Sequence, residues 1–325
     1  MPQPSIAPVR IGPVEKTHSP LALGCWSFGP QQWTGQEDTN LLGAMLAAED
    51  RGITHFDTAS GYGDGYSETL IGRFIGGSEE RRRRLFIASK ADPDDMSAQS
   101  MVAAIDASRA HLQTDVIDLY YIHWPRSGTD MRPAMEGLET ARQRGIIGAV
   151  GVSNFSVEQM EQVSEAGRID AHQLNYNLFW RYSEQEIIPY CAAHGIAVVT
   201  YSSLAHGILS GKFPREPYLP EGDQRREILL FQGDVWPHVY QAAEELKARA
   251  VESGRPLIHL AIRWLLRQPA ITSVLVGARN RQQVEHNAAA LEGDAPDWVI
   301  DRMTAISDRT LKHIPNRGNV YGYYP

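Results

Sequence analysis

Eight short β-like runs recur along the chain, and each is followed by a segment with the apolar spacing of a helix. The runs are residues 21–24, 53–57, 85–90, 116–123, 147–154, 171–175, 196–202 and 273–277. The run ends at Asp57, Lys90, His123 and Asn154 lie 33, 33 and 31 residues apart, a spacing that fits one βα unit after another. Eight such units close into a (β/α)8 barrel of the TIM type, which takes about 250 residues and carries any excess in loops.

The helical pattern covers residues 38–51, 97–111, 131–144, 157–166, 183–194 and 235–253. An open, doubly wound α/β sheet is the competing architecture. The glycine-rich turn Gly61-x-Gly63-x-Gly65 does not follow the order of a dinucleotide fingerprint, and a loop that needs positive φ angles explains it better. We therefore expect one α/β barrel domain over residues 1–325.

Two segments exceed the needs of a plain barrel. Residues 203–234, about thirty residues rich in glycine, proline and charge, separate the seventh run from the next helix. Ordinary βα loops take about 2–6 residues, so a loop this long predicts a lid or a binding segment. The tail, residues 316–325, is either a frayed end or a second loop that folds over the barrel mouth.

The composition indicates a globular protein, with 42% hydrophobic and 22% charged residues. A formal charge of −8 argues against binding to nucleic acid or to an anionic membrane. The basic run 81–84 is interpreted as a solvated turn. Two cysteines, Cys25 and Cys191, give no disulfide framework, and no run is long enough to span a membrane, so we expect a cytoplasmic protein, either a monomer or a homo-oligomer.

Charged and polar residues end three neighbouring runs, namely Asp57, Lys90 and His123. Chemistry in such barrels lies at the carboxyl ends of the strands, where side chains converge above a packed core. A charge beside a core is costly unless it is paired, so we expect an ion pair between Asp57 and Lys90. Tyr62 follows five residues after Asp57, within reach of the same place.

A phenol has a pKa of about 10, which is too high for a ready acid at neutral pH. A nearby ammonium stabilises phenolate and lowers that pKa, whereas burial raises it, so we expect Lys90 to outweigh burial. Tyr62 would then exchange a proton with a developing alkoxide, and His123 would orient the carbonyl oxygen. Asp57 would hold Lys90 in place.

None of these groups donates electrons, so a reduction would take its hydride from a cofactor. Tyr201 ends a run and presents a flat ring that suits a nicotinamide, although it would equally cap the core. Ser153, Asn154 and Gln173 carry hydroxyl and amide groups that suit a carboxamide. Residues 202–212 and 277–280 occupy the loops where barrels often bind phosphate, and the second loop opens a helix.

Six segments in order carry a family resemblance: DTASGYG (57–63), IASK (87–90), LYYIHWP (119–125), GVSNF (151–155), LAHGILSGK (204–212) and VGARNRQQVEHN (276–287). Together they resemble the aldo-keto reductases, and in particular the bacterial branch related to the voltage-gated potassium channel β subunits. The resemblance implies a barrel that binds NADP(H) and reduces carbonyls, with Asp57, Tyr62, Lys90 and His123 as its catalytic residues.

The resemblance also implies the contacts of the cofactor. Arg279 would face the 2′-phosphate, while Gly277 stands where other branches carry a lysine, which leaves NADP preference to Arg279. The implied contact residues are Cys25, Trp26, Asp57, Ser153, Asn154, Gln173, Tyr201, Ser202, Ser203, Leu204, Gly207, Lys212, Gly277, Arg279, Gln283 and Asn287. The expected substrate contacts are Trp26, Trp33, Tyr62, His123 and Trp124, around a small-molecule carbonyl or alcohol.

Three other functions stay open. A metal-dependent hydrolase would use His55 and Asp57, which share one face of a strand, with Lys90 and His123 to complete the site. A serine hydrolase would use GVSNF, which only half matches the nucleophile elbow because Phe155 replaces its second glycine. A non-enzymatic regulatory subunit would bind NADP tightly and turn over little. We expect no metal.

Overall fold

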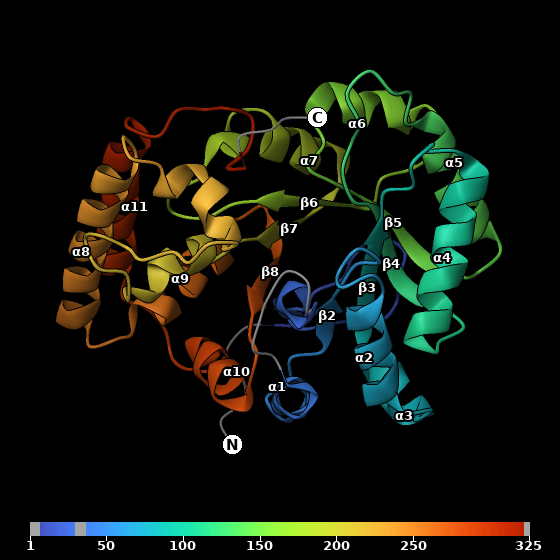
Figure 1. Ribbon diagram of the computed structural model, residues 1–325, viewed down its shortest axis with the longest axis horizontal. Helices are drawn as coiled ribbons and strands as arrows, with labels where there is room; N and C mark the ends of the chain where they lie inside the picture. Colours follow the sequence, from blue (N-terminus) through green and yellow to red (C-terminus); the bar gives the residue numbers. More distant parts are fainter. Residues whose placement is uncertain (1–6, 30–36, 322–325) are drawn as a thin grey trace.

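The computed structural model describes residues 7–29 and 37–321. Eight parallel strands close into a barrel in which each strand pairs with the next and β8 pairs with β1 (Figure 1). The strands are β1 (Leu21–Gly24), β2 (His55–Asp57), β3 (Phe86–Ala91), β4 (Ile117–Ile122), β5 (Ile147–Ser153), β6 (Ala171–Asn175), β7 (Ala197–Tyr201) and β8 (Ile271–Gly277). All eight predicted runs form strands. The predicted barrel is confirmed, and the open sheet is wrong.

Helices surround the barrel and return the chain from the end of one strand to the start of the next (Figure 1). They are α1 (Asp38–Asp50), α2 (Tyr66–Ile75), α3 (Glu79–Arg84), α4 (Ala98–Leu112), α5 (Arg132–Gln143), α6 (Val157–Ser164), α7 (Ile187–His194), α8 (Trp236–Ser253), α9 (Leu257–Leu266), α10 (Arg281–Ala288) and α11 (Asp297–Leu311). Local signals fix several ends. Ser156 and Gln159 form a capping box at the start of α6, and Gly254 ends α8 in the left-handed conformation.

One predicted helix, residues 183–194, is wrong at its start. The chain forms a short 3₁₀ turn at Tyr182–Glu184, and α7 begins only at Ile187. Pro189 explains the difference, because a helix that began at Ser183 would place this proline in its interior. There the missing N–H would remove a hydrogen bond and the ring would clash with the preceding turn.

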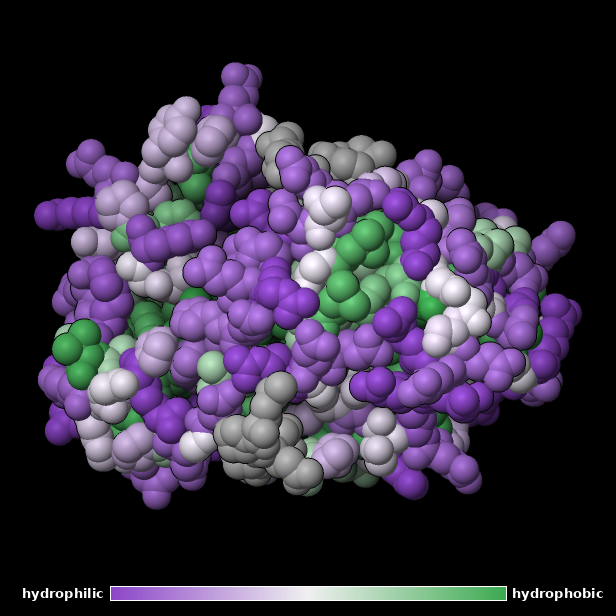
Figure 2. All heavy atoms as spheres, turned by 90° about the horizontal axis from the view of Figure 1, so that it is seen from below, coloured by the Kyte–Doolittle hydropathy of each residue, from purple (hydrophilic) through white to green (hydrophobic). Residues whose placement is uncertain are grey.

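The face of the molecule seen in Figure 2 is mainly hydrophilic. Its hydrophobic residues gather in a patch right of the middle and in smaller patches toward the left. Every helix within residues 7–29 and 37–321 is too short or too polar to cross a bilayer. This pattern fits helices that turn their apolar sides toward the barrel.

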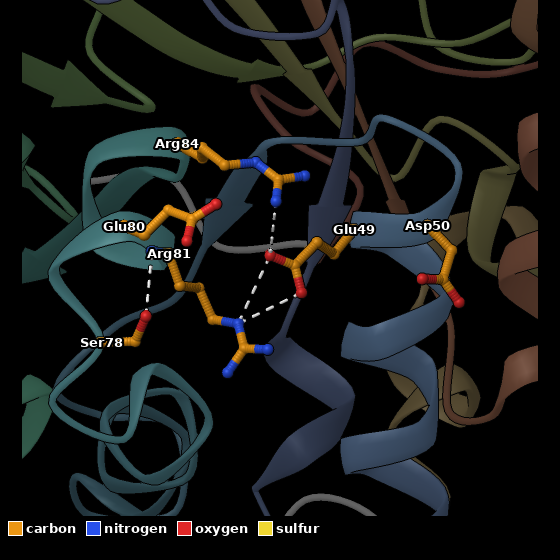
Figure 3. Close-up of a pocket in the computed structure, with 6 residues that line it drawn as sticks. All are labelled: Glu49, Asp50, Ser78, Glu80, Arg81 and Arg84. Carbon is orange, nitrogen blue, oxygen red and sulfur yellow. Dashed lines mark hydrogen bonds and ion pairs between the residues drawn. The ribbon is translucent and has the colours of Figure 1, made fainter.

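The basic run 81–84 is the last part of a helix, α3, so the predicted turn is wrong, whereas Arg83 and Arg84 are exposed, as predicted for a solvated run. Arg81 and Arg84 line a surface pocket in which both approach Glu49, at 3.1 and 3.5 Å (Figure 3). Arg82 lies 2.9 Å from Asp118, whose carboxylate is nearly buried. These arginines therefore form ion pairs with neighbouring carboxylates. The pocket lies at the end of the barrel where the strands begin.

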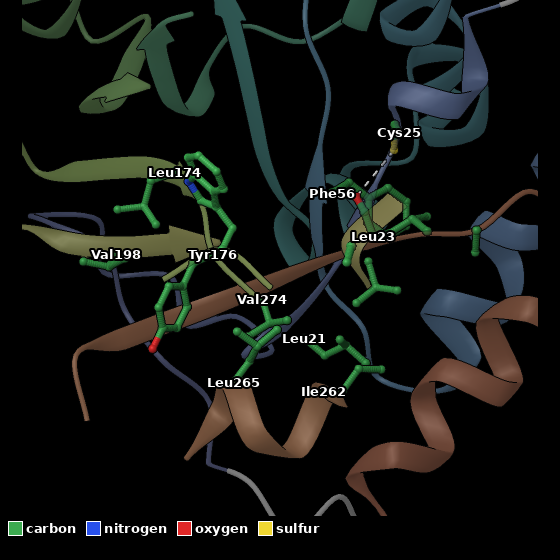
Figure 4. Packing of buried hydrophobic residues seen from close by; sticks show 14 of the residues in the cluster. Leu21, Leu23, Cys25, Phe56, Leu174, Tyr176, Val198, Ile262, Leu265 and Val274 are labelled. Carbon is green, nitrogen blue, oxygen red and sulfur yellow. Dashed lines mark hydrogen bonds between the residues drawn. The ribbon is translucent and has the colours of Figure 1, made fainter. Parts of the chain in front are cut away.

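The core has an inner and an outer layer. Phe86, Leu119 and Tyr121 belong to a buried cluster inside the barrel. A larger cluster lies between the strands and the helices, where Leu21 and Val274 of the barrel face Ile262 and Leu265 of α9 (Figure 4). Packing on both faces of the sheet holds the strand ends in fixed positions.

The long loop, residues 203–234, is largely exposed over residues 214–227, while its two ends are held by contacts with α8 and with the tail. It contains short 3₁₀ turns, and the Trp236 indole N–H donates to the Arg215 carbonyl at 2.7 Å. The Leu229 N–H donates to the carbonyl of Val320 in the tail at 2.7 Å, and both side chains are buried. Through residue 321 the tail is therefore a second loop held against the first, and residues 322–325 lie outside the described part.

Candidate active site

A buried ion pair joins the ends of β2 and β3. Lys90 Nζ donates to Asp57 Oδ1 and to the Thr58 carbonyl, each at 2.6 Å. The two charged side chains are 1% and 3% exposed. Gln173 on β6 donates its amide to Asp57 Oδ2 at 2.8 Å, so the carboxylate is bound from two sides. A charged network thus occupies the carboxyl ends of the strands, which is where functional side chains converge in barrels of this type.

Tyr62 reaches this network from the glycine-rich loop after β2. Gly63 and Gly65 take φ angles of 69° and 79°, which glycine adopts without strain and which bend the loop back over the barrel. Lys90 Nζ lies 5.0 Å from the centre of the Tyr62 ring, and the rings of Tyr62 and His123 meet edge to face at 5.8 Å. The fold brings together Asp57, Tyr62, Lys90 and His123.

The protonation states follow from burial. Burial raises the pKa of Tyr62 well above its ordinary value, and the carboxylate of Asp57 raises this pKa further. The sequence predicted a lowered Tyr62 pKa. That prediction is wrong because Lys90 binds Asp57 and the Thr58 carbonyl, and burial outweighs its charge. Burial lowers the pKa of His123 well below its ordinary value, and the charge of Lys90 lowers it further. At neutral pH the site holds a protonated phenol and a neutral imidazole.

A further carboxylate, Asp92, lies beside this group and was missed from the sequence. Its Oδ1 atom is 4.0 Å from Nδ1 of His123, and its side chain is 41% exposed. Asp92 also contributes to the raised pKa of Tyr62. Asp92 directly follows β3 and stands two residues beyond Lys90, so its position at the carboxyl end of a strand is a signal that the sequence carries.

The predicted nicotinamide contacts lie along the ends of β5, β6 and β7. Asn154, with a φ of 66°, donates from its amide to the His123 carbonyl at 3.2 Å and to the Ser153 hydroxyl at 3.0 Å. The Tyr201 hydroxyl donates to Asn154 Oδ1 at 2.6 Å. These hydrogen bonds connect the three residues to one another and to the strand that carries His123.

The start of the long loop has an unusual backbone. Ser202, Ala205 and His206 take φ angles of 50°, 47° and 54°, and Gly207 takes 94°. Non-glycine residues in this region cost about 1–3 kcal/mol each and gather at ligand sites. The Ser203 hydroxyl donates to the Leu275 carbonyl at 2.7 Å, which ties this loop to β8. Leu204 lies between these positions, in the same turn.

Three cations lie near one another, two in the long loop and one after β8. Burial lowers the pKa of Lys212, and the positive charges of Arg225 and Arg279 lower it further. Lys212 and Arg225 both approach the ring of Phe213, at 5.8 and 5.4 Å. Arg225 was missed from the sequence, because nothing in the long loop's local pattern indicates where that loop folds back. The predicted phosphate-binding region therefore holds one more arginine than expected, and this arginine forms an ion pair with Asp223.

The residues predicted for the adenosine end lie at β8 and α10. Gly277 is exposed at the end of β8, and the Arg279 N–H donates to the side-chain carbonyl of Gln283 at 2.8 Å. Asn280 caps α10 by accepting from the Gln283 N–H at 2.9 Å. Asn287 is buried on the same helix.

The remaining predicted contacts differ in exposure. Cys25 is fully buried, and its thiol donates to the Leu23 carbonyl at 3.6 Å, so its side chain does not reach the surface. Trp26 and Trp124 are half-buried. Trp124 meets Tyr321 of the tail edge to face at 6.1 Å, so the tail completes an aromatic wall. The predicted contact Trp33 lies outside the described residues.

The metal-site alternative finds no ligand set in the part of the chain that the structure describes. In that part no group of three or more histidine, cysteine, aspartate and glutamate residues is arranged to hold a metal. His55, the proposed partner of Asp57, instead lies 3.1 Å from the Ser273 hydroxyl, and its ring contacts His18 and Phe86.

Known proteins share both the sequence and the fold. The chain is 35% identical over 277 residues to aldo-keto reductase YhdN of Bacillus subtilis, covering 82% of this chain and 83% of that protein. It is 29% identical to the NADH-specific methylglyoxal reductase of Escherichia coli, covering 93% and 99% of the two chains. A probable voltage-gated potassium channel subunit beta of Arabidopsis thaliana is 28% identical, covering 93% and 96%. The predicted resemblance is confirmed.

Solved structures agree with this grouping. The glycerol dehydrogenase AKR11B4 from Gluconobacter oxydans matches with a TM-score of 0.85 and 31% identity over 95% of this chain and 96% of that one. An aldo/keto reductase from Klebsiella pneumoniae in complex with NADP and acetate matches with a TM-score of 0.72 and 26% identity, over 96% and 98%. The model of the aldo/keto reductase family matches residues 20–308, and the chain belongs to that family.

Proposed function

We propose that this oxidoreductase reduces aldehydes and ketones to alcohols with NADPH. The observation that carries the proposal is the convergence of Tyr62, His123 and the Lys90–Asp57 ion pair at one end of the barrel. The group offers a proton, a hydrogen-bonding imidazole and a buried cation to one substrate oxygen. A bound nicotinamide would supply the hydride that the protein lacks.

Tyr62 acts as the acid in this reaction. Its raised pKa keeps the phenol protonated at rest, so it can give its proton to the carbonyl oxygen as hydride reaches the carbonyl carbon. Lys90, 5.0 Å from the ring centre, stabilises the phenolate that remains, and solvent then returns the proton. The neutral imidazole of His123 orients the same oxygen by a hydrogen bond.

Asp57 keeps Lys90 in position through their 2.6 Å contact. The ion pair also keeps the ammonium charged in a buried place, where an unpaired charge would be costly. At 5.0 Å from the ring, this charge reduces the free-energy cost of forming the phenolate, although burial and Asp57 outweigh it and keep the Tyr62 pKa high in the resting site. This arrangement assigns proton transfer to Tyr62 and charge stabilisation to Lys90.

The cofactor would extend from the ends of β5–β7 to α10. Ser153, Asn154 and Gln173 would hold the carboxamide, with Tyr201 against the nicotinamide ring. The further proposed contacts are Trp26, Ser202, Ser203, Leu204, Gly207, Lys212, Gly277, Arg279, Gln283 and Asn287. We assign NADPH over NADH because Lys212 and Arg279 lie near each other at the proposed phosphate end, where their charges would favour a 2′-phosphate. Arg225 lies near them but pairs with Asp223. The Escherichia coli relative is NADH-specific, so this preference rests on the cations of this chain.

The test is NADPH oxidation by the purified protein with 4-nitrobenzaldehyde, beside NADH and a control without aldehyde. Aldehyde-dependent oxidation that prefers NADPH is the expected result. Equal rates with both cofactors would contradict the role of the cation cluster. Tight NADPH binding without turnover would favour the regulatory-subunit alternative, and no binding would contradict the proposed cofactor site.

A further inference from the structure

The proposed carbonyl site has an acidic group at its rim. Asp92 follows β3 directly, and its Oδ1 atom lies 4.0 Å from Nδ1 of His123. At 41% side-chain exposure, the carboxylate faces both the site and solvent. A substrate oxygen held by Tyr62 and His123 would place the rest of the substrate close to this charge.

Most of the other charges around the carbonyl site are paired with an opposite charge. Lys90 is neutralised by Asp57 at 2.6 Å, and His123 is neutral because burial lowers its pKa. Arg126 donates to the backbone carbonyl of Asp92 at 3.1 Å, and its side-chain ion pair is with Asp94 at 3.4 Å. Burial raises the pKa of the Asp92 carboxyl, and the charge of Arg126 lowers it, so Arg126 offsets part of the carboxylate's charge. Within residues 7–29 and 37–321, no lysine or arginine nitrogen lies within 4.0 Å of the Asp92 carboxylate.

The opposite wall adds no charge. Trp124 meets Tyr321 at 6.1 Å, and Tyr321 meets His206 at 5.7 Å. Burial lowers the pKa of His206 to about 4, so this imidazole is neutral at pH 7. The rim of the site therefore combines aromatic and neutral surface with one carboxylate. The clustered cations lie toward the phosphate end, where the proposed cofactor would neutralise them.

We propose that Asp92 is a specificity-determining residue that selects against carbonyl substrates bearing a carboxylate, and in favour of neutral or cationic aldehydes and ketones. This inference rests on the proposed carbonyl reduction. Two unit charges about 7 Å apart at an effective dielectric constant of about 40 change binding roughly sevenfold. A carboxylate on the substrate would suffer that loss, and an ammonium would gain by the same factor.

The experiment compares kcat/KM for 4-carboxybenzaldehyde and 4-nitrobenzaldehyde, because the carboxylate and the neutral nitro group have nearly the same shape. The Asp92→Asn variant should raise the ratio of the first to the second roughly sevenfold. Effects of the variant on Tyr62 or His123 act on both substrates and cancel in the ratio. Asp94→Asn is the matched control, since this neighbouring carboxylate is fully exposed and pairs with Arg126, and its ratio should match the wild type.

Salt gives a second measurement that needs no variant. Raising the ionic strength from about 0.01 to 0.15 M shortens the screening length from about 30 to 8 Å, so the wild-type ratio should rise toward that of Asp92→Asn. A ratio that neither Asp92→Asn nor salt changes would overturn the inference while leaving carbonyl reduction in place. A wild-type protein that reduces neither aldehyde would overturn the proposed function, and the inference with it.

Discussion

The Asp57→Asn substitution tests how the site is held together. Lys90 and Asp57 are 1% and 3% exposed and lie 2.6 Å apart, so each charge depends on the other. Asparagine keeps the shape and can still accept the Gln173 amide, but it leaves the Lys90 ammonium without a counter-charge. Breaking a buried pair from one side costs about 3–5 kcal/mol, and we expect that loss in the free energy of unfolding.

The reverse change, Lys90→Met, leaves the Asp57 carboxylate with only the Gln173 amide and should cost a similar amount. Replacing both residues removes both charges, and substitution of a whole buried pair is often nearly neutral. The double variant should therefore be more stable than the sum of the single losses predicts. A coupling energy of at least about 2 kcal/mol falls in the range measured for residues in direct contact.

Urea unfolding of the four proteins at pH 7, followed by circular dichroism, measures this cycle. The matched control is the exposed pair of Arg83 and Glu79, whose side chains are 71% and 88% exposed. Water screens that pair, so Arg83→Met should leave the unfolding midpoint unchanged. Single losses that add within about 0.5 kcal/mol in the double variant would refute the coupled ion pair.

Four further predictions concern activity and stability. Tyr62→Phe should lower kcat/KM for 4-nitrobenzaldehyde at least about 100-fold while NADPH affinity, measured by fluorescence, stays within about twofold, because only the acid is lost. Arg279→Ala should weaken NADPH about tenfold more than NADH in the same titration, and equal weakening would place the 2′-phosphate elsewhere. Burial lowers the pKa of His172 to about 4, so its contribution to stability is full above about pH 6.5 and falls by about 1.4 kcal/mol per pH unit below it. His172→Gln should flatten the pH dependence of the urea midpoint between pH 6.5 and 5, and an unchanged slope would contradict this. Gly137→Ala should cost about 1–3 kcal/mol of unfolding free energy, because the new Cβ would lie 2.7 Å from a backbone oxygen of α4. In Gly43→Ala, the control, the new Cβ meets nothing within 4 Å, so this variant should be more stable by about 0.4–1 kcal/mol.

The strands were predictable because each is a short apolar run bounded by turn residues, and a parallel barrel places such runs at regular spacing. The errors came from interactions beyond that pattern. The start of α7 depends on Pro189, whose effect is local and readable in the sequence. The helix Glu79–Arg84 carries local signals that the predicted turn did not take into account: Ser78 caps it by accepting from the Arg81 N–H, and acidic residues in its first turn precede the arginines of its last turn.

The proposed site divides in the same way. Asp57, Lys90 and His123 end consecutive strands, so the barrel itself implies that they converge. Arg225 comes from a long loop whose path depends on contacts such as Trp236 with Arg215, and no spacing rule predicts such a path. The direction of the Tyr62 pKa was predicted wrongly because it depends on a balance between burial and neighbouring charges. Residue types reveal the charges but not the burial.

A buried ion pair is weak evidence for stability, because well-packed neutral side chains of similar volume often serve a fold equally well. If the Asp57→Asn/Lys90→Met variant folds, as the cycle above predicts, the pair's value to the protein must lie in its chemistry. Such a variant should keep the barrel's circular dichroism spectrum and still fail to reduce 4-nitrobenzaldehyde, because no cation would remain to stabilise the Tyr62 phenolate. A folded double variant that retained activity would instead show that the phenol needs no lysine, and would remove Lys90 from the mechanism.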